Sequence, residues 1–408
     1  MKPSLSIVLA GGQGERLRPL TNDRAKPSVP FGGHYRIIDF VLSNIVNSGL
    51  FRILVLTQFK ADALLRHLKR GWHLPALLDQ FIDAVPAQMR TGSHWYKGSA
   101  DAVFQNLHHI FNSGAENIAI FGGDHIYRMN CLHLIESHER SDADATIAVI
   151  PCPRKEASGF GIASCDESWR VVDFLEKPAK PPAMPGNKEM SLCSMGIYVF
   201  KTEALVDAVK RDAANRESSH DFGRDIIPSI FRKNKVMAYN FAENPVPGTT
   251  PQERGYWRDI GTIDAYWKAS MDLISVSPIF NLYNNAWSIK TARESYPPSK
   301  FVFSDEKKDR VGKATDSLVC DGAIISGGRI DRSILSPCVR VNSFSQIEES
   351  IIFDHVNVGR YAKIRRAIID KDVIISPHTT IGYDLNEDRK RFHVSPEGIV
   401  VIPKGVTV

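Results

Sequence analysis

Several common sequence signatures are missing from this 408-residue chain, and each absence excludes a class of protein. No run of about 18 apolar residues occurs, so the sequence predicts no helix that spans a membrane. No Gly-Lys-Ser/Thr follows the N-terminal glycines, and Leu17 stands where a dinucleotide-binding fingerprint needs its third glycine. Gly-x-Ser-x-Gly and His-Glu-x-x-His are absent too, which argues against serine hydrolases and zinc proteases.

Cysteine pairs with metal-ligand spacing and a large charge excess are also lacking. The six cysteines, at positions 131, 152, 165, 193, 320 and 338, include no CxxC spacing. We therefore expect reduced thiols in a cytoplasmic protein and no zinc site. The net charge of +5 is small for this length, which favours anionic ligands at local sites over binding of nucleic acid. The opening MKPSLSIVLAGG is interpreted as a core strand rather than a secretion signal.

What the chain does contain is a glycine-rich stretch at residues 9–27, LAGGQGERLRPLTNDRAKP, directly after a strand-length apolar run. The predicted ligand contacts here are Leu9, Ala10, Gly11, Gly12 and Gly14. Glycines let backbone N–H groups approach a ligand closely, and Arg16 and Lys26 add fixed positive charge. This combination predicts a cradle for a nucleoside triphosphate, although a purely structural turn would also use glycines.

The spelling Gly-Gly-x-Gly-x-Arg-Leu-x-Pro-Leu-Thr, followed by Lys-Pro, resembles the sugar-1-phosphate nucleotidyltransferases. Its continuation is similar to the bacterial glucose-1-phosphate adenylyltransferases (ADP-glucose pyrophosphorylases), on the segments Phe31-Gly-Gly33, Arg36–Phe40, Leu42-Ser-Asn44 and Asn47-Ser-Gly49. The resemblance implies the reaction of ATP with α-D-glucose 1-phosphate to give ADP-glucose and diphosphate. It further implies Mg²⁺ dependence, allosteric regulation, a homotetramer and a place in glycogen or α-glucan synthesis.

The pattern divides the chain into two domains and a connection. Residues 1–276 alternate strand and helix patterns, which predicts an α/β domain with a mostly parallel sheet; the resemblance implies its Rossmann-like, GT-A-type form. Residues 277–317 are irregular and predict a linker. From residue 318 to about 383 aliphatic residues recur about every sixth position, which favours a parallel β-helix over antiparallel hairpins for a C-terminal domain of residues 318–408. The resemblance implies a left-handed coil that serves oligomerisation and effector binding.

Individual elements are expected at the following positions. The predicted strands are Leu5–Ala10, Ile53–Thr57, Ile118–Phe121, Thr146–Ile150, Val171–Leu175, Ser194–Phe200 and Val236–Phe241. The predicted helices are Ala61–Arg70, Ala100–Phe111, Cys131–Arg140, Glu203–Asp212 and Thr262–Val276. The recurring aliphatic residues are Leu335, Val341, Ile347, Ile352, Val358, Ile364, Ile369, Ile375 and Ile381.

Two aspartates are the predicted metal ligands. Asp124 follows the strand Ile118–Phe121 beside two glycines, a position that suits a Mg²⁺ ligand near substrate phosphates. Asp259 is the second candidate, and the resemblance favours this role over a helix N-cap near Thr262. In the expected mechanism the sugar phosphate attacks the α-phosphorus of ATP in line. Arg16 and Lys26 then hold the β and γ phosphates.

The resemblance also assigns the sugar, base and effector contacts. Glucose 1-phosphate is expected at Tyr96, Gly161, Glu176, Lys177 and Ser194, with Lys177 on its phosphate. The base and ribose are expected at Gln88 and Gly98. Phosphorylated effectors are expected at Arg24, Arg36, Lys371 and Lys404, with Gln58 and Trp95 relaying activation.

The identity of the effector and the choice among rival functions stay open at this point. Asp23, Pro30 and His355 replace effector-binding residues of enteric relatives, which argues against a fructose bisphosphate activator and tight AMP inhibition and favours a smaller sugar phosphate. One rival is a uridylyl- or guanylyltransferase with the same phosphate loop. A second is an inactive regulatory subunit, and a third is an acyltransferase that uses His355 or His378 in its coil.

Overall fold

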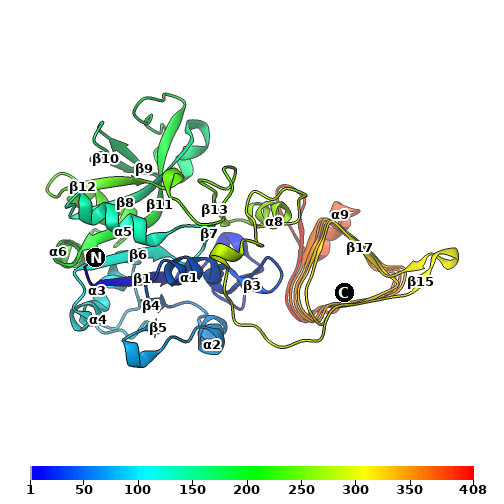
Figure 1. Cartoon of the computed structure of the whole chain (residues 1–408). Helices are drawn as coiled ribbons and strands as arrows, with labels where there is room; N and C mark the ends of the chain where they lie inside the picture. Colours follow the sequence, from blue (N-terminus) through cyan, green and yellow to red (C-terminus); the bar gives the residue numbers. More distant parts are fainter. Residues whose placement is uncertain (1) are drawn as a thin grey trace.

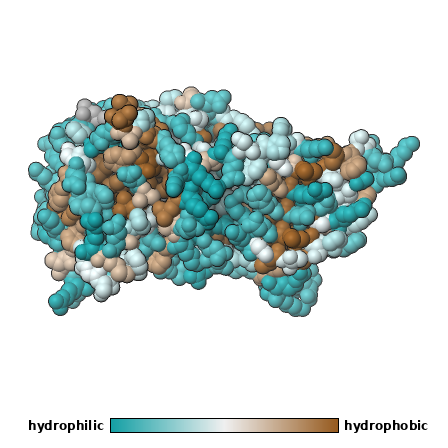
Figure 2. Space-filling model, turned by 90° about the horizontal axis from the view of Figure 1, so that it is seen from below, coloured by the Kyte–Doolittle hydropathy of each residue, from teal (hydrophilic) through white to brown (hydrophobic). Residues whose placement is uncertain are grey.

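The computed structural model describes residues 2–408 as a larger α/β domain beside a triangular coil of short strands (Figure 1). A connecting segment runs along the underside of the molecule between them. Within residues 2–408, no helix combines the length and the apolar character that crossing a bilayer requires. Seen from below, the surface is mainly hydrophilic, and its larger hydrophobic areas gather on the α/β domain (Figure 2).

The α/β domain is built on a nine-stranded sheet in the order β10-β9-β11-β6-β1-β4-β5, with β8 and β12 continuing from β11. Strands β6, β1, β4 and β5 are parallel, whereas β11 pairs antiparallel with β6, β8 and β9. The strands are β1 (Ser4–Ala10), β4 (Arg52–Thr57), β5 (Phe81–Pro86), β6 (Asn117–Gly122), β8 (Ala145–Pro153), β9 (Gly161–Cys165), β10 (Val171–Glu176), β11 (Met190–Lys201) and β12 (Val236–Asn240). Two small ribbons add β2 (Pro30–Phe31) with β3 (Tyr35–Arg36), and β7 (His125–Tyr127) with β13 (Trp257–Asp259).

Helices cover both faces of this sheet and bury two apolar layers. Residues from α1, α2 and α5 pack on one face, and residues from α3, α4 and α6 pack on the other. The α-helices of the described chain are α1 (Ile37–Asn47), α2 (Asp62–Gly71), α3 (Ser99–Gln105), α4 (Leu107–Ser113), α5 (Cys131–Arg140), α6 (Thr202–Ala214), α7 (Ile227–Ile230), α8 (Ile263–Asp272) and α9 (Leu385–Arg391). Of these, α9 belongs to the C-terminal coil. Both layers cover β1, whose carboxyl end leads into the glycine-rich stretch.

Most predicted elements are present, and two of the predicted helices differ in extent. The single helix expected over Ala100–Phe111 is interrupted at Asn106, whose side-chain amide donates to the carbonyl of Ala102 at 2.8 Å. Such local side-chain bonds compete with helical backbone bonds. The helix expected to reach Val276 ends at Asp272.

His138 on α5 gives a pH-dependent contribution to stability. It is buried and lies 2.8 Å from the Thr146 hydroxyl, and burial, helped by the charge of Lys201, lowers its pKa to about 4. The folded state therefore holds a neutral imidazole while the unfolded chain, with a His pKa of about 6.5, takes up a proton. We expect this contribution to be complete above pH 6.5 and to be lost towards pH 4, a change of about 3 kcal/mol.

Urea unfolding at pH 7 and pH 4.5 measures this effect. His138→Asn keeps a polar group near the position of Nδ1 but does not titrate in this range. The variant should therefore lose less stability than the parent on acidification, and an equal loss in both proteins would contradict the prediction.

The C-terminal domain is a parallel β-helix, which excludes the alternative of antiparallel hairpins. Its core column runs through Ile330, Ile347, Ile364 and Ile381, which pair in that order, so each of these coils takes 17 residues. All nine aliphatic residues of the predicted period are buried. Corners repeat at the same spacing: Phe344, Tyr361 and His378 have positive φ angles, and their rings stack at 4.8 and 4.9 Å.

Three strand columns form the faces of the coil. The first is β14 (Lys300–Val302), β19 (Ile324–Ser326), β22 (Arg340–Val341), β25 (Asn357–Val358) and β28 (Ile374–Ile375). The second is β17 (Lys313–Thr315), β20 (Arg329–Asp331), β23 (Gln346–Glu348), β26 (Lys363–Arg365) and β29 (Thr380–Ile381). The third is β18 (Leu318–Val319), β21 (Ile334–Leu335), β24 (Ile351–Ile352), β27 (Ala367–Ile369), β31 (Val400–Ile402) and β30 (His393–Val394).

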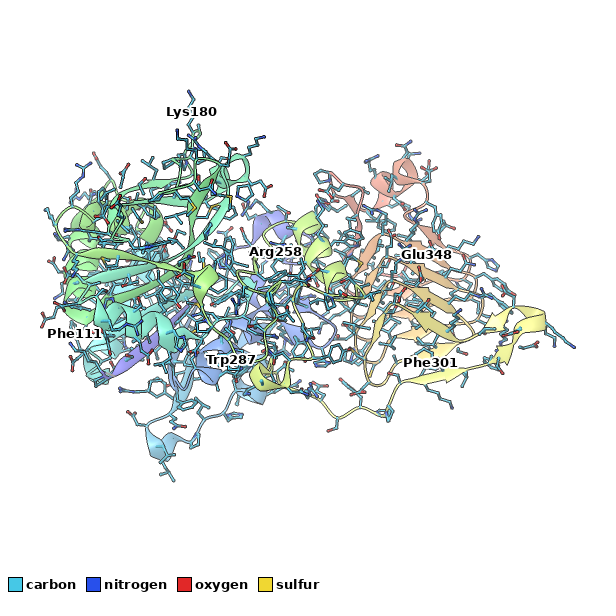
Figure 3. The ribbon with its side chains drawn as sticks, turned by 45° about the horizontal axis from the view of Figure 1, so that its top comes forward. Phe111, Lys180, Arg258, Trp287, Phe301 and Glu348 are labelled. Carbon is cyan, nitrogen blue, oxygen red and sulfur yellow. A yellow bond between two sulfur atoms is a disulfide. The ribbon has the colours of Figure 1, made fainter. Side chains whose placement is uncertain are left out.

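The coil begins earlier than the expected boundary at residue 318. Strands β14 and β17 lie in the segment predicted as a linker, and they pair in parallel with β19 and β20. A hairpin of β15 (Ser304–Asp305) and β16 (Arg310–Val311) projects between them. Phe301, on β14, lies at the base of this projection (Figure 3). The irregular sequence of this segment hid these strands because each is only two or three residues long.

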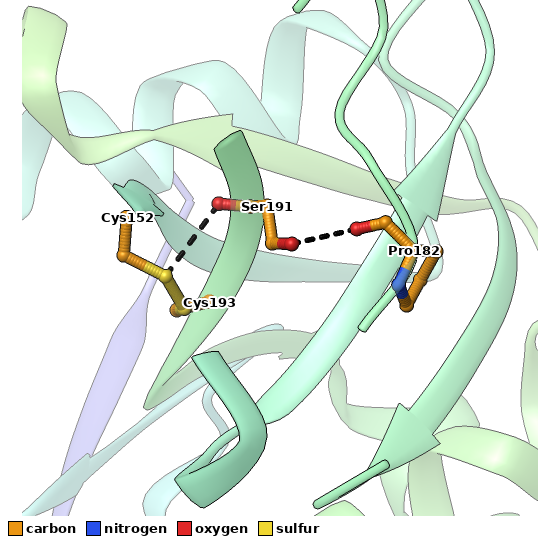
Figure 4. The surroundings of a disulfide bond; sticks show 4 residues. All are labelled: Cys152, Pro182, Ser191 and Cys193. Carbon is orange, nitrogen blue, oxygen red and sulfur yellow. Dashed lines mark hydrogen bonds between the residues drawn. A yellow bond between two sulfur atoms is a disulfide. The ribbon is translucent and has the colours of Figure 1, made fainter. Parts of the chain in front are cut away.

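The expectation that all cysteines are reduced is wrong for two of them. Antiparallel pairing of β8 with β11 brings Cys152 and Cys193 to a Cα separation of 6.3 Å, and a disulfide joins them (Figure 4). Periodicity could not reveal this because the two positions become neighbours only through the register of the strands. The other cysteines, Cys131, Cys165, Cys320 and Cys338, are free.

An apolar layer joins the two domains. Ile263 and Tyr266 of α8 belong to one buried cluster with Ile334, Ile351 and Ile368 of the coil. A buried ion pair crosses the same interface, because Nη2 of Arg24 lies 2.8 Å from Oδ1 and 3.0 Å from Oδ2 of Asp370. Trp287 lies in the connecting segment against the α/β domain, and its indole nitrogen donates to Asn44 at 3.2 Å (Figure 3).

Candidate active site

A cleft of about 810 Å³ opens at the carboxyl ends of β1, β4 and β6. Open parallel sheets bind ligands at this edge. The predicted triphosphate contacts that line it are Leu9, Ala10, Gly11, Gly12, Gly14, Arg16 and Lys26. Tyr96, Gly98 and Gln58 line the cleft as well. The glycine-rich stretch and residues about 80 positions further along the chain therefore face one space.

Gly14 explains why this stretch needs glycine. Its φ is +62°, and a Cβ there would lie 3.0 Å from Cβ of Lys26 and 3.1 Å from Cγ2 of Thr21. The Thr21 hydroxyl donates to the Gly14 carbonyl at 2.9 Å, which closes the turn. A side chain at Gly14 would therefore displace Lys26, whereas Gly12 faces open space.

Lys26 lies between the two predicted metal ligands. Its ammonium is 2.9 Å from Oδ2 of Asp124 and 3.0 Å from Oδ1 of Asp259, and the lysine is buried. Burial opposes its charge, but the two carboxylates outweigh burial and raise the pKa of Lys26. Burial likewise opposes the charge on Asp124, but His125 and Lys26 lower the pKa of that carboxyl to about 2. Lys26 and Asp124 are therefore both charged at neutral pH.

These carboxylates fit a divalent cation. One ligand atom each from Asp124, His125 and Asp259 lie within 4.8 Å of one another. Oxygen donors of this kind suit Mg²⁺. The alternative of a helix cap for Asp259 is excluded, because the hydroxyl of Thr262 caps α8 by accepting from the Ala265 amide at 3.2 Å.

Comparisons with known proteins agree with this arrangement. The family model of nucleotidyl transferases matches residues 5–276, and a GlmU-like C-terminal hexapeptide model matches residues 297–402. A glucose-1-phosphate adenylyltransferase of Anaeromyxobacter sp. (strain Fw109-5) is 54% identical over the whole of both chains. The chain belongs to the glucose-1-phosphate adenylyltransferase family.

Two further relatives bear the same activity in their names. The glucose-1-phosphate adenylyltransferase of Thermus thermophilus is 53% identical over 98% of both chains. Glucose-1-phosphate adenylyltransferase 1 of Vibrio parahaemolyticus is 48% identical over 99% of this chain and 98% of its own. The protein is therefore a nucleotidyltransferase, and the predicted fold class is confirmed, with a hexapeptide-repeat coil consistent with a left-handed β-helix.

Of the predicted sugar contacts, Tyr96 lines this cleft, whereas Gly161, Glu176, Lys177 and Ser194 are not among its lining residues. The Tyr96 hydroxyl accepts from Asn106 at 2.8 Å, and its backbone amide donates to Gln58 at 2.8 Å. A Cβ on Gly161 or Gly223 would lie 2.8 Å from Oε2 of Glu176, so both glycines leave space for that carboxylate. Lys177 follows at a positive φ with a mostly exposed side chain, and its ammonium is 3.4 Å from Oε1 of Glu176.

Gln88, Trp95 and Ser194 also lie outside the cleft lining. Gln88 is exposed and accepts from Nε of Arg90 at 3.2 Å, and Trp95 has 52% of its surface exposed. Ser194 is buried on β11, where its hydroxyl accepts from the Gly196 amide at 3.3 Å. Gln88 and Trp95 belong to a largely exposed surface segment.

Sequence reasoning missed Asp221. Asp221 and Ser99 both line the cleft, and the Ser99 hydroxyl donates to Oδ2 of Asp221 at 2.9 Å. Asp221 also accepts from the amides of Gly223 and Arg224 at the start of a helical turn. Glycine at position 98 lets this segment approach the segment that contains Asp221, because a Cβ there would lie 2.3 Å from the His220 carbonyl oxygen. No local motif marks Asp221, so only the tertiary structure reveals it.

A second pocket of about 820 Å³ lies between the two domains. It brings together all four predicted effector residues, Arg24, Arg36, Lys371 and Lys404. Three of them already have carboxylate partners: Arg24 pairs with Asp370, Lys371 with Asp354, and Lys404 with Asp372 at 3.7 Å. The guanidinium of Arg36 donates only to a carbonyl, that of Ala63, at 3.0 Å among the contacts within residues 2–408.

Proposed function

We propose that the protein transfers the adenylyl group of ATP to glucose 1-phosphate, giving ADP-glucose and diphosphate. The observation that carries the proposal is the charged triad of Lys26, Asp124 and Asp259 beside the glycine-rich stretch. A polyphosphate needs backbone N–H groups and fixed cations on one side and a metal site on the other, and this arrangement of residues supports the proposal.

The proposed mechanism is in-line displacement at the α-phosphorus without a covalent enzyme intermediate. Arg16 and Lys26 bind the β and γ phosphates and stabilise the charge of the leaving diphosphate. Lys177 and Glu176 orient the sugar phosphate, and Asp124 and Asp259 hold Mg²⁺. When bound, Mg²⁺ neutralises phosphate charge. Positioning and electrostatics supply most of the catalysis, because two polyanions must approach each other.

The choice of nucleotide is tested by measuring diphosphate release with ATP, UTP and GTP separately, each with glucose 1-phosphate. We expect ATP to be strongly preferred. A preference for UTP or GTP would replace the proposal with the rival transferase, and no release with any nucleotide would favour an inactive regulatory subunit. The acyltransferase alternative has little support, because His378 stacks on Tyr361 in a corner column of the coil.

Lys177→Ala should raise KM for glucose 1-phosphate about tenfold, with a smaller change in kcat. A bond to a charged group contributes about 1.5–3 kcal/mol, and solvent exposure places Lys177 at the lower end. Lys180→Ala is the matched control, because this lysine is three residues further on and points away from the domain (Figure 3). Steady-state kinetics with varied sugar phosphate measure both variants, and equal KM changes would refute the assignment.

We further propose that a phosphorylated effector binds the pocket between the domains, that the enzyme is a homotetramer and that it acts in the cytoplasm, in glycogen or α-glucan synthesis. Arg36 and Arg293 both line this pocket and offer guanidinium groups to an anion. Activation by a panel of sugar phosphates, compared between the parent and Arg36→Met, tests the first statement. Sedimentation velocity tests the second.

A further inference from the structure

His125 faces the same space as the two metal-binding aspartates. In the ribbon of β7 and β13, Asp259 pairs directly with His125 in antiparallel register. Residues opposite each other in such a pair have Cβ atoms about 4.5–5.5 Å apart. The backbone register therefore places the imidazole beside the Asp259 carboxylate. Asp124 immediately precedes His125 in the chain. Potential ligand atoms of all three residues lie within 4.8 Å of one another.

Both ring nitrogens of His125 lack a hydrogen bond. Nδ1 is buried without a partner in the part of the chain that the structure describes. Nε2 lies 3.6 Å from Oδ1 of Asp124, which is too long for a hydrogen bond. The ring packs edge-on against Trp257 with centroids 5.1 Å apart, and only 15% of the side chain is exposed. A largely buried imidazole with no partner, beside two carboxylates, has the properties of a metal ligand.

We propose that His125 is a third protein ligand to the divalent cation, and that its nitrogen lets the site bind Mn²⁺ and Co²⁺ as well as Mg²⁺. This inference rests on the metal site of the proposed function. Carboxylates suit Mg²⁺ and Mn²⁺, whereas imidazole suits borderline transition ions. Two aspartates alone would give an all-oxygen protein donor set, so the imidazole changes which metals the site favours.

Pulsed electron paramagnetic resonance of bound Mn²⁺ tests the proposal directly. The full chain is loaded with Mn²⁺ and inorganic triphosphate, which contains no nitrogen. We expect modulation from a directly coordinated ¹⁴N nucleus. Labelling the histidines with ¹⁵N should remove the ¹⁴N modulation without any substitution, so folding of a variant cannot confuse the result. Bound Mn²⁺ without histidine modulation in the parent protein would overturn the proposal.

Two variants complete the test. His125→Asn should abolish the modulation and weaken Mn²⁺ binding about 10–100-fold, by analogy with losses around metal sites, and Mg²⁺ binding should weaken less. His109→Asn is the matched control because His109, on α4, is not among the described residues grouped to hold a metal ion and should keep the signal. A signal that persists in His125→Asn would also overturn the proposal.

Asp124→Asn separates this inference from the proposed metal site itself. Loss of Mn²⁺ binding in this variant supports the site. If Mn²⁺ binds the parent and is lost in Asp124→Asn, but no histidine modulation appears, only the role of His125 is wrong. If Asp124→Asn binds Mn²⁺ as well as the parent, both the metal site and the role of His125 are wrong.

Discussion

Lys26→Met should lower kcat by about 10²–10³, the typical cost of removing one preorganised group aimed at developing charge. The ammonium of Lys26 is held by Asp124 and Asp259 at the edge of the cleft, so it is already positioned before substrate arrives. Methionine keeps much of the side-chain volume and removes only the charge. Steady-state kinetics with saturating ATP and glucose 1-phosphate measure the loss.

A second measurement reports on the same residue without turnover. Without Lys26 the two carboxylates face each other with no lysine between them, so they should bind a divalent cation more tightly. Calorimetric titration of Lys26→Met with Mg²⁺ alone should therefore show a lower Kd than the parent. Weaker binding would show that Lys26 supports the metal site instead of competing with it.

Lys97→Met provides the control for charge. Lys97 also lines the cleft, but it is exposed and makes no ion pair within residues 2–408. Its removal takes the same charge from the cleft without affecting either aspartate, and we expect a much smaller loss of kcat. Equal losses would mean that the net charge of the cleft, and not the position of Lys26, determines the rate.

Asp370→Ala should destabilise the protein by about 3–5 kcal/mol, because it leaves the buried charge of Arg24 without a partner. Arg24 and Asp370 are both almost completely buried where the two domains meet. Burial raises the pKa of Asp370 even though Arg24 favours its charged form, which reflects the cost of desolvating this carboxylate. The free energy of urea unfolding, followed by tryptophan fluorescence, measures the effect.

Two comparisons isolate the buried pair. The double variant Arg24→Met/Asp370→Leu removes both charges and should recover most of the lost stability, as replacement of buried ion pairs often does. Asp62→Ala breaks an exposed pair with Arg66 that has a distance of 2.6 Å, and it should cost less than about 1 kcal/mol. A double variant as unstable as Asp370→Ala would contradict the explanation.

The sequence predicted local chemistry better than long-range register. The glycine-rich stretch, Asp124 and the aliphatic period were recognisable because each depends on spacing within a few residues, and α5 matches its predicted bounds. The two aspartates come together at Lys26 because β7 pairs with β13, and these strands lie more than 120 positions apart in the chain. Motifs cannot specify that pairing.

The remaining differences have the same origin. Cys152 and Cys193 become neighbours through strand register, and Asp221 reaches the cleft through its contact with Ser99. Asn106 interrupts a helix because its side chain donates a hydrogen bond to a backbone carbonyl. Helix propensities do not predict such a specific bond. Strand β14 was missed because its partner lies in the following coil.

The 17-residue repeat of the β-helix limits how this domain can vary in length. One extra residue inside a strand would turn the following side chains of that strand from the interior to the surface. Small changes in length are tolerated at the corners between strands, since the coil from Lys313 to Arg329 takes 16 residues, and where the chain leaves the repeat, as the hairpin of β15 and β16 does. During evolution the strand columns themselves should lengthen or shorten by whole coils.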